Sequence, residues 1–303
     1  MFDALLDRSI VASFDRTGFV RHARGFAAGP WRDLGGTRVL ITGGTSGIGL
    51  SAARSLSEHG AHCALWGRRQ DVGEQAARTV SGSFQSVDLA DLDAVRRAAW
   101  QVRGPLTGVV LNAGAMPMER MLSPQGHEQM WASQVLGHLV LLRILERRGL
   151  LDEDTRVVWV ASGGMYLQGL DLSDLTWERG YSRHTAYANA KRAQVLLASE
   201  LATRWPGVPM ASMHPGWVET PAVASSMPMF FRIARPILRS PEQGADTIVW
   251  WVATRETPET GRFWFDRAPA PEHLSRRTRR PDAPILLRAI LTATDAFLDR
   301  PVP

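Results

Sequence analysis

Short apolar segments alternate with longer amphipathic segments over most of the chain, and this alternation restricts the fold more than any other feature. From residue 38 onward, short runs rich in Val, Ile and Leu are each followed by a segment with helical spacing of apolar residues. Strands that alternate with helices form βαβ units, which place helices on both faces of a parallel sheet. The expected strands are 38–41, 62–66, 83–87, 107–111, 156–161, 208–213 and 262–266, and the expected long helices are about 125–148, 185–204, 241–254 and 284–298.

We therefore predict an α/β fold with one Rossmann-type, doubly wound domain at 37–270 and about seven mostly parallel strands. The chain has 303 residues, of which 45% are hydrophobic, enough to fill the core of one such domain. No apolar run approaches the ~18 residues that a membrane span needs. Asp3 and Asp7 stand where a signal peptide would be basic, so we expect a cytoplasmic protein.

The segments that flank this domain each allow two interpretations. In the leader at 1–36, apolar residues recur at helical spacing and predict an amphipathic helix. This helix either packs on the domain or makes a weak peripheral contact with a membrane or partner through residues 1–20. The tail at 271–303 carries arginines at 276–280, which are either solvated or in weak contact with a polyanion. The net charge is +5, but the arginines are scattered, and we expect no nucleic-acid partner.

A glycine-rich turn directly follows the first expected strand and begins a helix. Glycines allow a tight turn and a close approach of the backbone to a diphosphate, and the helix N-terminus supplies free N–H groups. The spacing is G-x-x-x-G-x-G, and its position after the first strand favours a dinucleotide site. The residues expected to bind the cofactor here are Thr42, Gly43, Thr45, Ser46, Gly47, Ile48 and Gly49.

Two arginines, Arg68 and Arg69, stand at the end of the second expected strand. An acid at this position would accept hydrogen bonds from a ribose 2′-hydroxyl and favour NAD. Guanidinium groups suit a 2′-phosphate instead. We predict NADP(H), with Arg68 as the main contact, unless both arginines are merely solvated.

Tyr187 and Lys191 are four residues apart on an expected helix, so they share a face. A nearby ammonium lowers the pKa of a tyrosine, which can then exchange a proton with a carbonyl or alcohol oxygen. Of the 35 basic residues in the chain, Lys191 is the one lysine, which strengthens this interpretation. Ser162, at the end of the fifth strand, would hydrogen-bond the same oxygen, unless it serves only the turn before Gly163.

Other groups of residues are less specific. The eight histidines show no ligand spacing and Cys63 is the one cysteine, so we predict neither a metal site nor an intrachain disulfide. Several large apolar residues either line a pocket or belong to ordinary packing. They are Met165, Trp217, Met227, Met229, Phe230 and Phe231.

Over residues 37–266 the sequence resembles the short-chain dehydrogenase/reductase family, and within it most closely the dehydrogenase/reductase member 12-like group. Six motifs in the expected order carry the resemblance. The separation of 25 residues between Ser162 and Tyr187 resembles the insert of retinol-dehydrogenase-like members. The motifs are TGGTSGIG (42–49), DLAD (88–91), LNAG (111–114), VASGG (160–164), YANAK (187–191) and HPGWVETP (214–221).

The resemblance implies further roles. It places Asp88 and Leu89 by the adenine and Lys191 also on the nicotinamide ribose, and it implies a substrate lid at 222–240. It further implies a homodimer or homotetramer built through the two long helices. Asn112, Ala113 and Gly114 would support the central strand and the cofactor, and Pro215, Gly216, Val218 and Thr220 would hold the nicotinamide.

One position departs from the family pattern. By alignment, Gln134 replaces an asparagine that supports a water-linked proton relay from the lysine. The extra methylene would shift or break that relay. The sequence thus predicts hydride transfer between NADP(H) and a carbonyl or alcohol of an apolar small molecule. The alternative is a non-catalytic nucleotide-sensing or scaffold protein on the same fold.

Overall fold

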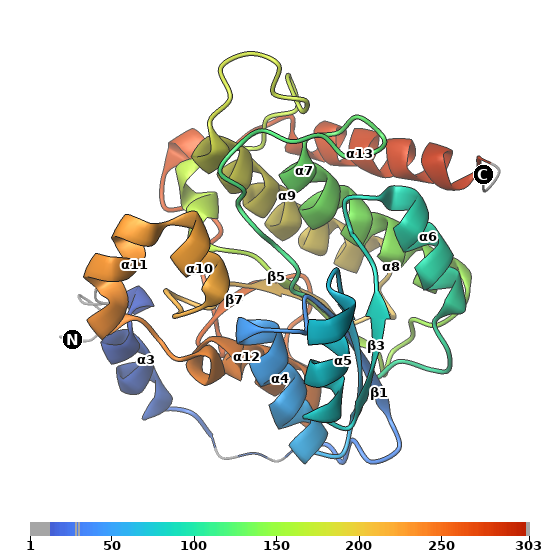
Figure 1. Cartoon of the computed structure of the whole chain (residues 1–303), viewed down its shortest axis with the longest axis vertical. Coiled ribbons are helices and arrows are strands. Elements are labelled where there is room, and N and C mark those ends of the chain that lie inside the picture. The colour runs from blue at the N-terminus through green and yellow to red at the C-terminus, as the bar shows by residue number, and fades with distance from the viewer. Residues whose placement is uncertain (1–12, 28, 30, 301–303) are drawn as a thin grey trace.

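The computed structural model describes residues 13–27, 29 and 31–300. These form one eight-stranded sheet in the order β3-β2-β1-β4-β5-β6-β7-β8, in which every neighbouring pair except β7 and β8 is parallel (Figure 1). The α/β doubly wound architecture is confirmed. The strands are β1 Arg38–Thr42, β2 His62–Gly67, β3 Gly82–Ser86, β4 Gly108–Leu111, β5 Arg156–Val160, β6 Met210–Met213, β7 Phe263–Phe265 and β8 Ala268–Pro269.

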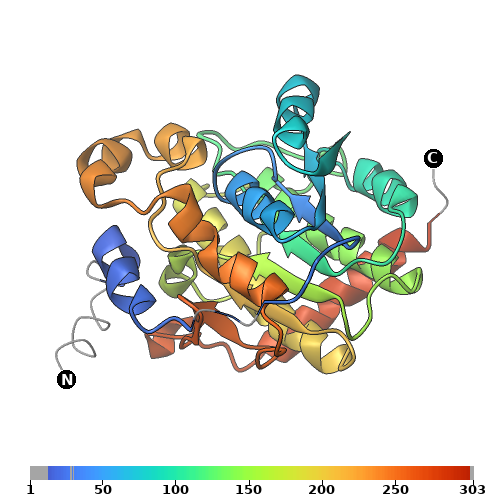
Figure 2. The ribbon, with the colours of Figure 1, turned by 90° about the horizontal axis from the view of Figure 1, so that it is seen from below.

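Helices cover both faces of the sheet, as Figure 2 shows. Alternate strand residues point to opposite faces, so Leu40 packs into one hydrophobic cluster while Val39 and Ile41 pack into the other. The first face carries α6 (Leu92–Gln101), α8 (Gly137–Arg147) and α9 (Arg183–Arg204). The second carries α4 (Gly47–Glu58), α5 (Gln70–Arg78) and α12 (Pro241–Ala253).

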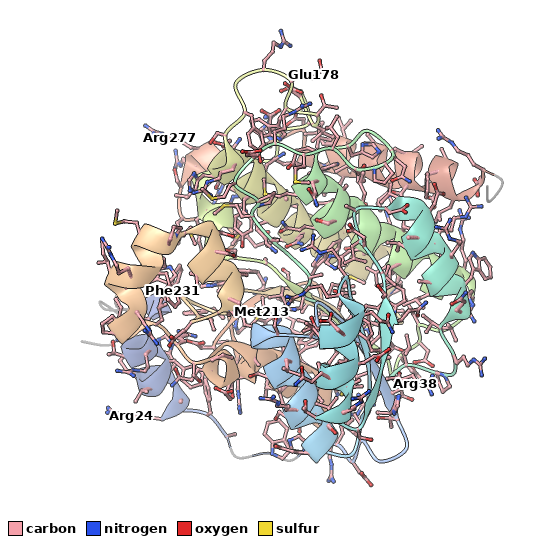
Figure 3. The ribbon with its side chains drawn as sticks, viewed as in Figure 1. Arg24, Arg38, Glu178, Met213, Phe231 and Arg277 are labelled. Carbon is pink, nitrogen blue, oxygen red and sulfur yellow. The ribbon has the colours of Figure 1, made fainter. Side chains whose placement is uncertain are left out.

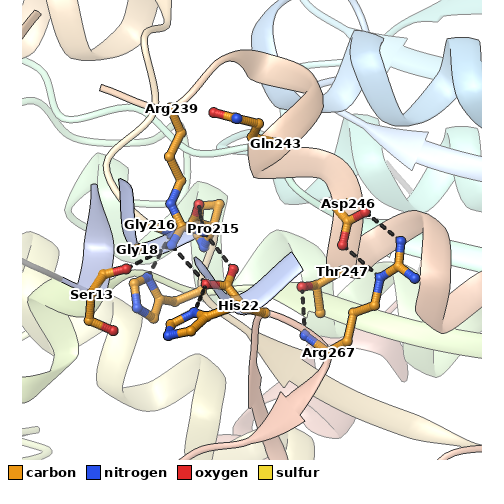
Figure 4. Close-up of polar contacts among 12 residues, drawn as sticks. Ser13, Gly18, His22, Pro215, Gly216, Arg239, Gln243, Asp246, Thr247 and Arg267 are labelled. Carbon is orange, nitrogen blue, oxygen red and sulfur yellow. Dashed lines mark hydrogen bonds and ion pairs between the residues drawn. The ribbon is translucent and has the colours of Figure 1, made fainter. Parts of the chain in front are cut away.

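The sequence predicts about seven strands, and β8 is not among them. β8 returns antiparallel to β7 through a turn at Asp266 and Arg267, whose φ angles are +49° and +60°. Two-residue turns between antiparallel strands favour Asn-Gly or Asp-Gly pairs, so the Asp-Arg pair did not indicate a hairpin in the sequence. Here the ion pairs of Asp266 with Arg239 and of Arg267 with Asp246 hold both residues in the left-handed region (Figure 4).

The helix expected at about 125–148 is divided into three parts. It begins as α7 (Gln129–Trp131), passes through a π-helical turn at Ala132–Leu136 and continues as α8. In that turn the N–H of Gly137 bonds to the carbonyl of Ala132, five residues back. A π-helical turn inside a helix often lies at a functional site.

Two further helices lie outside the layers of the sheet. α13 (Ala283–Leu298) packs across α8 and α9, and it buries Leu287, Ile290 and Leu291 there. α3 (Arg16–Ala23) lies at the other side of the molecule, beside α11 (Pro228–Ala234), in both views (Figures 1 and 2). The structure therefore places the leader next to the loops that follow β6.

Candidate active site

A cleft of about 830 Å³ follows the carboxyl edge of the parallel strands. It crosses the point between β1 and β4 where the strand order reverses. Open α/β sheets bind their ligands at such a reversal. Loops after β1, β2, β4, β5 and β6 contribute its walls, so residues far apart in sequence meet in one site.

The turn between β1 and α4 presents its backbone to the cleft. Gly43 and Gly47 have φ angles of +64° and +52°, a region that favours glycine. A Cβ on Gly49 would stand 2.4 Å from the carbonyl oxygen of Gly43, so no side chain fits there. Ser46 precedes α4 and makes no side-chain capping bond, which leaves N–H groups of the first helical turn for an anion. This turn could hold a diphosphate.

Arg68 and Arg69 lie at the exposed end of this cleft, directly after β2. Neither guanidinium pairs with a carboxylate among the residues that the structure describes. Asp88 is also exposed there, and its Oδ1 accepts a hydrogen bond of 2.9 Å from the N–H of Ala90. Leu89, which is buried, completes the wall beside it. The end of the cleft is therefore basic, with two cations available to a ligand.

Asn112 joins the end of β4 to the glycine-rich turn. Its Nδ2 donates to the carbonyl oxygens of Thr42 and Gly43, at 3.1 Å each. The N–H groups of Asn112 and Ala113 donate to Thr42 Oγ1, at 3.0 and 3.1 Å. These bonds fix the two loops relative to each other, which fits the supporting role that the resemblance implies.

Ser162 and Tyr187 meet in the middle of the cleft. Ser162 directly follows β5, and its Oγ accepts a hydrogen bond of 3.2 Å from the N–H of Gly164. Tyr187 lies on α9, with its ring beside Gly164. A Cβ on Gly164 would be 3.4 Å from the Tyr187 ring and 3.6 Å from Ser162 Oγ. Burial raises the pKa of Tyr187, and a hydrogen bond with Ser162 opposes this effect.

Lys191 lies one helical turn beyond Tyr187, with its Nζ 5.5 Å from the centre of the tyrosine ring. The ammonium donates to the carbonyl of Val160 and to Oε1 of Gln194, both at 3.0 Å. Burial lowers the pKa of Lys191 to about 7. The effect of Lys191 on the acidity of Tyr187, which the sequence predicts, stays a prediction.

Gln134 is fully buried on the π-helical turn. Its Nε2 donates to the carbonyl of Ala115 at 2.7 Å, and its Oε1 has no hydrogen-bond partner in the described part of the chain. A Cβ on Gly114 would stand 3.1 Å from Gln134 Oε1 and 3.3 Å from Lys191 Nζ. The longer side chain therefore points into the loop after β4, on the same glycine that the lysine approaches.

The loop that follows β6 rests on a buried arginine. Gly216 has a φ of +78°, and a Cβ there would stand 2.4 Å from Nε of Arg239. Arg239 is fully buried and contacts both carboxylate oxygens of Asp266 (Figure 4). Thr220 caps α10 (Pro221–Ser226), and its side chain lies against Gly47. Pro215, Gly216, Val218 and Thr220 all line the cleft.

The leader is part of this packing. Arg239 donates to the carbonyls of Ser13 and Asp15, and His22 contacts Asp266 at 2.6 Å (Figure 4). The ring of Phe14 lies edge-on to His214, with centroids 4.2 Å apart, inside the domain core. The leader thus packs on the domain through the residues from Ser13 onward. The other apolar positions of its predicted helix, Phe2, Leu5, Leu6, Ile10 and Val11, lie outside the described residues.

An apolar wall faces Ser162 and Tyr187. Of the predicted lining residues, Trp217, Met227 and Phe230 do line the cleft. Met165 is instead buried in a separate cluster, and Met229 on α11 is 63% exposed. Figure 3 shows Phe231 on α11, outside the set that lines the cleft. The sequence prediction missed four methionines on or after the loop that follows β4, namely Met116, Met118, Met121 and Met130.

The insert between Ser162 and Tyr187 extends from the same region of the molecule. Glu178 lies near its outer tip (Figure 3), while Trp177 and Tyr181 pack inward with Met116 and Met130. Within the described residues there is no cluster of ligands for a metal ion. No helix in that part of the chain is long and apolar enough to cross a membrane.

Comparison with known proteins decides the family. The model of the short chain dehydrogenase family matches residues 37–229, which is more than half of the chain. The chain belongs to the short chain dehydrogenase family. Dehydrogenase/reductase SDR family member 12 of Homo sapiens is 35% identical over 259 residues, which cover 80% of each chain. Retinol dehydrogenase 11 of Mus musculus is 31% identical, over 73% of this chain and 74% of its own.

A solved structure shares the fold. A protein of Mycobacterium paratuberculosis superposes with a TM-score of 0.72 and 26% identity, covering 92% of this short chain dehydrogenase and 99% of its own chain. The predicted family and the resemblance to member 12 are thereby confirmed. The structure brings most of the predicted site residues of this family member together in one cleft, but Thr42, Gly49 and Gln134 are not among the residues that line it. The individual roles of the predicted site residues belong to the proposal below.

Proposed function

We propose that this short chain dehydrogenase is an NADP(H)-dependent oxidoreductase that transfers a hydride between the nicotinamide and a carbonyl or alcohol carbon of an apolar small molecule. One observation carries the proposal. A single cleft holds Ser162, Tyr187 and Lys191 in its middle and two exposed arginines, Arg68 and Arg69, at its end. The spacing of these groups along one sheet edge suits an extended dinucleotide.

The residues present fit this cofactor. The turn at 42–49 is a cradle that side chains would fill, because Cβ atoms on Gly43 and Gly49 would collide with backbone. The arginines favour a ribose that carries a 2′-phosphate, since each guanidinium can donate several hydrogen bonds to phosphate oxygens. The loop at 215–220 would hold the nicotinamide next to Tyr187 and Lys191, with Thr220 near its carboxamide.

The cofactor supplies or accepts the hydride, and the side chains manage the proton. Ser162 Oγ orients and polarises the substrate oxygen. Tyr187 Oη gives a proton to that oxygen during reduction and takes it back during oxidation. Lys191, when protonated, places a positive charge beside the phenol, which favours the phenolate that forms in the reductive direction. It would also contact the ribose of the bound cofactor.

The apolar wall supports an apolar substrate. Five of the ten methionines line the cleft, and methionine side chains adapt to irregular apolar shapes. Residues 222–240 form α10, α11 and the turn after them, and we propose that they act as the lid. The name of the retinol dehydrogenase relative, which refers to an apolar alcohol, agrees with this substrate class.

Two measurements test the proposal. The chain has 11 tryptophans, so quenching of their fluorescence can follow titration with NADPH and, separately, NADH. We expect tighter binding of NADPH, followed by NADPH oxidation with apolar ketones or aldehydes. A preference for NADH would overturn the cofactor assignment alone. Binding without turnover over a broad panel of carbonyls would favour the non-catalytic alternative.

A further inference from the structure

The ammonium of Lys191 is held by an amide on its own helix. Gln194 lies three residues after Lys191 on α9 and is fully buried. Its Oε1 accepts from Lys191 Nζ at 3.0 Å, while its Nε2 donates to the carbonyl of Gln134 at 2.7 Å. A rotated amide would place one donor against another donor, so these two contacts fix its orientation.

The Nε2 side of the Gln194 amide is held by the π-helical turn. The carbonyl of Gln134 belongs to the π-helical turn between α7 and α8. Gly137, at the end of that turn, packs so closely that a Cβ would stand 2.2 Å from the carbonyl oxygen of Leu89. The acceptor of Lys191 is therefore bonded to the π-helical turn as well as belonging to α9.

The surroundings of Lys191 contain no compensating carboxylate among the described contacts. The titratable groups that face it are Tyr187 from α9 and His138 from α8, and burial lowers the pKa of His138 to about 3, so His138 is neutral. Lys191 is 3% exposed, and its ammonium donates to two oxygens, those of Val160 and Gln194. Each such charge-assisted bond favours the protonated form of the amine.

We propose that Gln194 is a positioning residue for Lys191, which favours the protonated amine and directs it toward Tyr187. An ammonium has three N–H groups, and Val160 and Gln194 accept two of them. The third is left for the cleft, which Lys191 lines. Behind the lysine, the amide binds the Gln134 carbonyl directly, where the family pattern has a water-linked relay. Proton exchange of Lys191 with solvent then takes place on the cleft side.

The effect on Lys191 can be measured without any turnover. Because Lys191 is the one lysine of the chain, lysine labelled with ¹³C at Cε gives one side-chain NMR signal, whose pH titration reports this amine. Gln194→Leu removes the acceptor at similar volume, and we expect the midpoint of the titration to fall by about one pH unit or more. Gln194→Glu places a carboxylate there, and the midpoint should rise.

Asn189 supplies a matched control on the same helix. Its amide is also buried and bonded at both ends, to the backbone of Asp171, but it does not contact Lys191. Asn189→Leu should reduce stability and leave the lysine midpoint unchanged. An unchanged midpoint in folded Gln194→Leu would overturn the proposal. If that variant does not fold, a midpoint in Gln194→Glu that fails to rise would do the same.

The catalytic consequence rests on the proposed function. In alcohol oxidation at pH 7, kcat of Gln194→Leu should fall about tenfold, and its pH profile should move to higher pH because the phenolate of Tyr187 loses a nearby charge. Gln194→Glu should restore the profile. A lysine midpoint that responds as expected in a protein without turnover would refute the proposed function alone. Turnover with no change in either midpoint or profile would refute the role of Gln194 alone.

Discussion

Arg239 donates hydrogen bonds to both carboxylate oxygens of Asp266, at 2.6 and 2.8 Å. The side chains of Arg239 and Asp266 are 0% and 5% exposed. The rings of Phe265 and Phe19 lie 4.8 and 5.3 Å from the guanidinium carbon. The pair is therefore almost fully buried and depends on its protein partners. It also lies directly under Gly216, in the loop that we assign to the nicotinamide.

Loss of this arginine should destabilise the protein strongly. Arg239→Met leaves the carboxylate of Asp266 buried without its main partner, and we expect the free energy of unfolding to fall by about 3–5 kcal/mol. Urea unfolding followed by tryptophan fluorescence measures this change. Arg235→Met is the control, because its pair with Glu219 is exposed and should contribute less than about 1 kcal/mol. Equal effects of the two variants would contradict the structural role of Arg239.

Removal of the Tyr187 hydroxyl should abolish turnover and spare the cofactor. Tyr187→Phe keeps the ring but removes the proton donor, so we expect kcat to fall roughly 10²-fold or more. NADPH titration should give nearly the affinity of the unmodified protein. Tyr166→Phe serves as the control, since that hydroxyl donates to the carbonyl of Pro271, away from the cleft. Full activity of Tyr187→Phe would refute the mechanism.

Reversal of charge at Arg68 should change the cofactor preference. In Arg68→Asp a phosphate meets a carboxylate in place of a guanidinium, and NADPH affinity should fall at least about tenfold. NADH, which lacks that phosphate, should bind as well or better. The comparison is Arg78→Asp, at a site on α5 where the side chain is 79% exposed and outside the cleft. A constant ratio of the two affinities would show that Arg68 is merely solvated.

Stability should depend on pH through Lys191. Its pKa is about 7 in the folded protein and 10.5 ordinarily, so between these values the unfolded chain binds a proton that the folded chain does not. The free energy of unfolding therefore rises with pH in this interval. Lys191→Met should reduce that slope by ~1 kcal/mol per pH unit between about pH 7.5 and 8.5. Urea unfolding at several pH values measures the slope of the unfolding free energy against pH, with Asn189→Leu as the comparison. A slope that Lys191→Met leaves unchanged would show that the lysine titrates normally.

The oligomeric state is open to a direct measurement. The homodimer or homotetramer expected through the two long helices stays a prediction, but α13 lies on α8 and α9. Leu287 and Leu291 are buried there, and Asp295 pairs with Arg143. This helix covers part of the surface through which the predicted oligomer would form. Light scattering after size-exclusion chromatography measures the mass: a dimer or tetramer would require displacement of α13 or another surface, and a monomer would refute the predicted oligomer.

Much of the fold was predictable, because the alternation of strands and helices is a local property. The strands from β1 to β7 fall within one or two residues of their predicted ends. β8 was not predictable, since Asp266 and Arg267 adopt their turn through ion pairs with Arg239 and Asp246. Those partners are remote in sequence and leave no local pattern.

The candidate site divides in the same way. The glycine-rich turn, Tyr187 and Lys191 stand out because their spacing is short and the chain has a single lysine. The role of Gln194 could not be predicted, because it depends on a hydrogen bond to Gln134, which is sixty residues away in sequence. The methionines around Met116 were missed for a related reason, since loop residues carry no periodicity that shows which way they face.

Ser13, Phe14 and Asp15 connect the leader to the loops around the cleft. A recombinant fragment cut just before β1, where the family similarity begins, would remove two carbonyl acceptors from Arg239. It would also remove the ring that packs between the Gly163 loop and His214. We therefore expect the stable unit to include residues before the boundary of sequence similarity at residue 37, so that a truncation far from the cleft in sequence would act on the loops that form it.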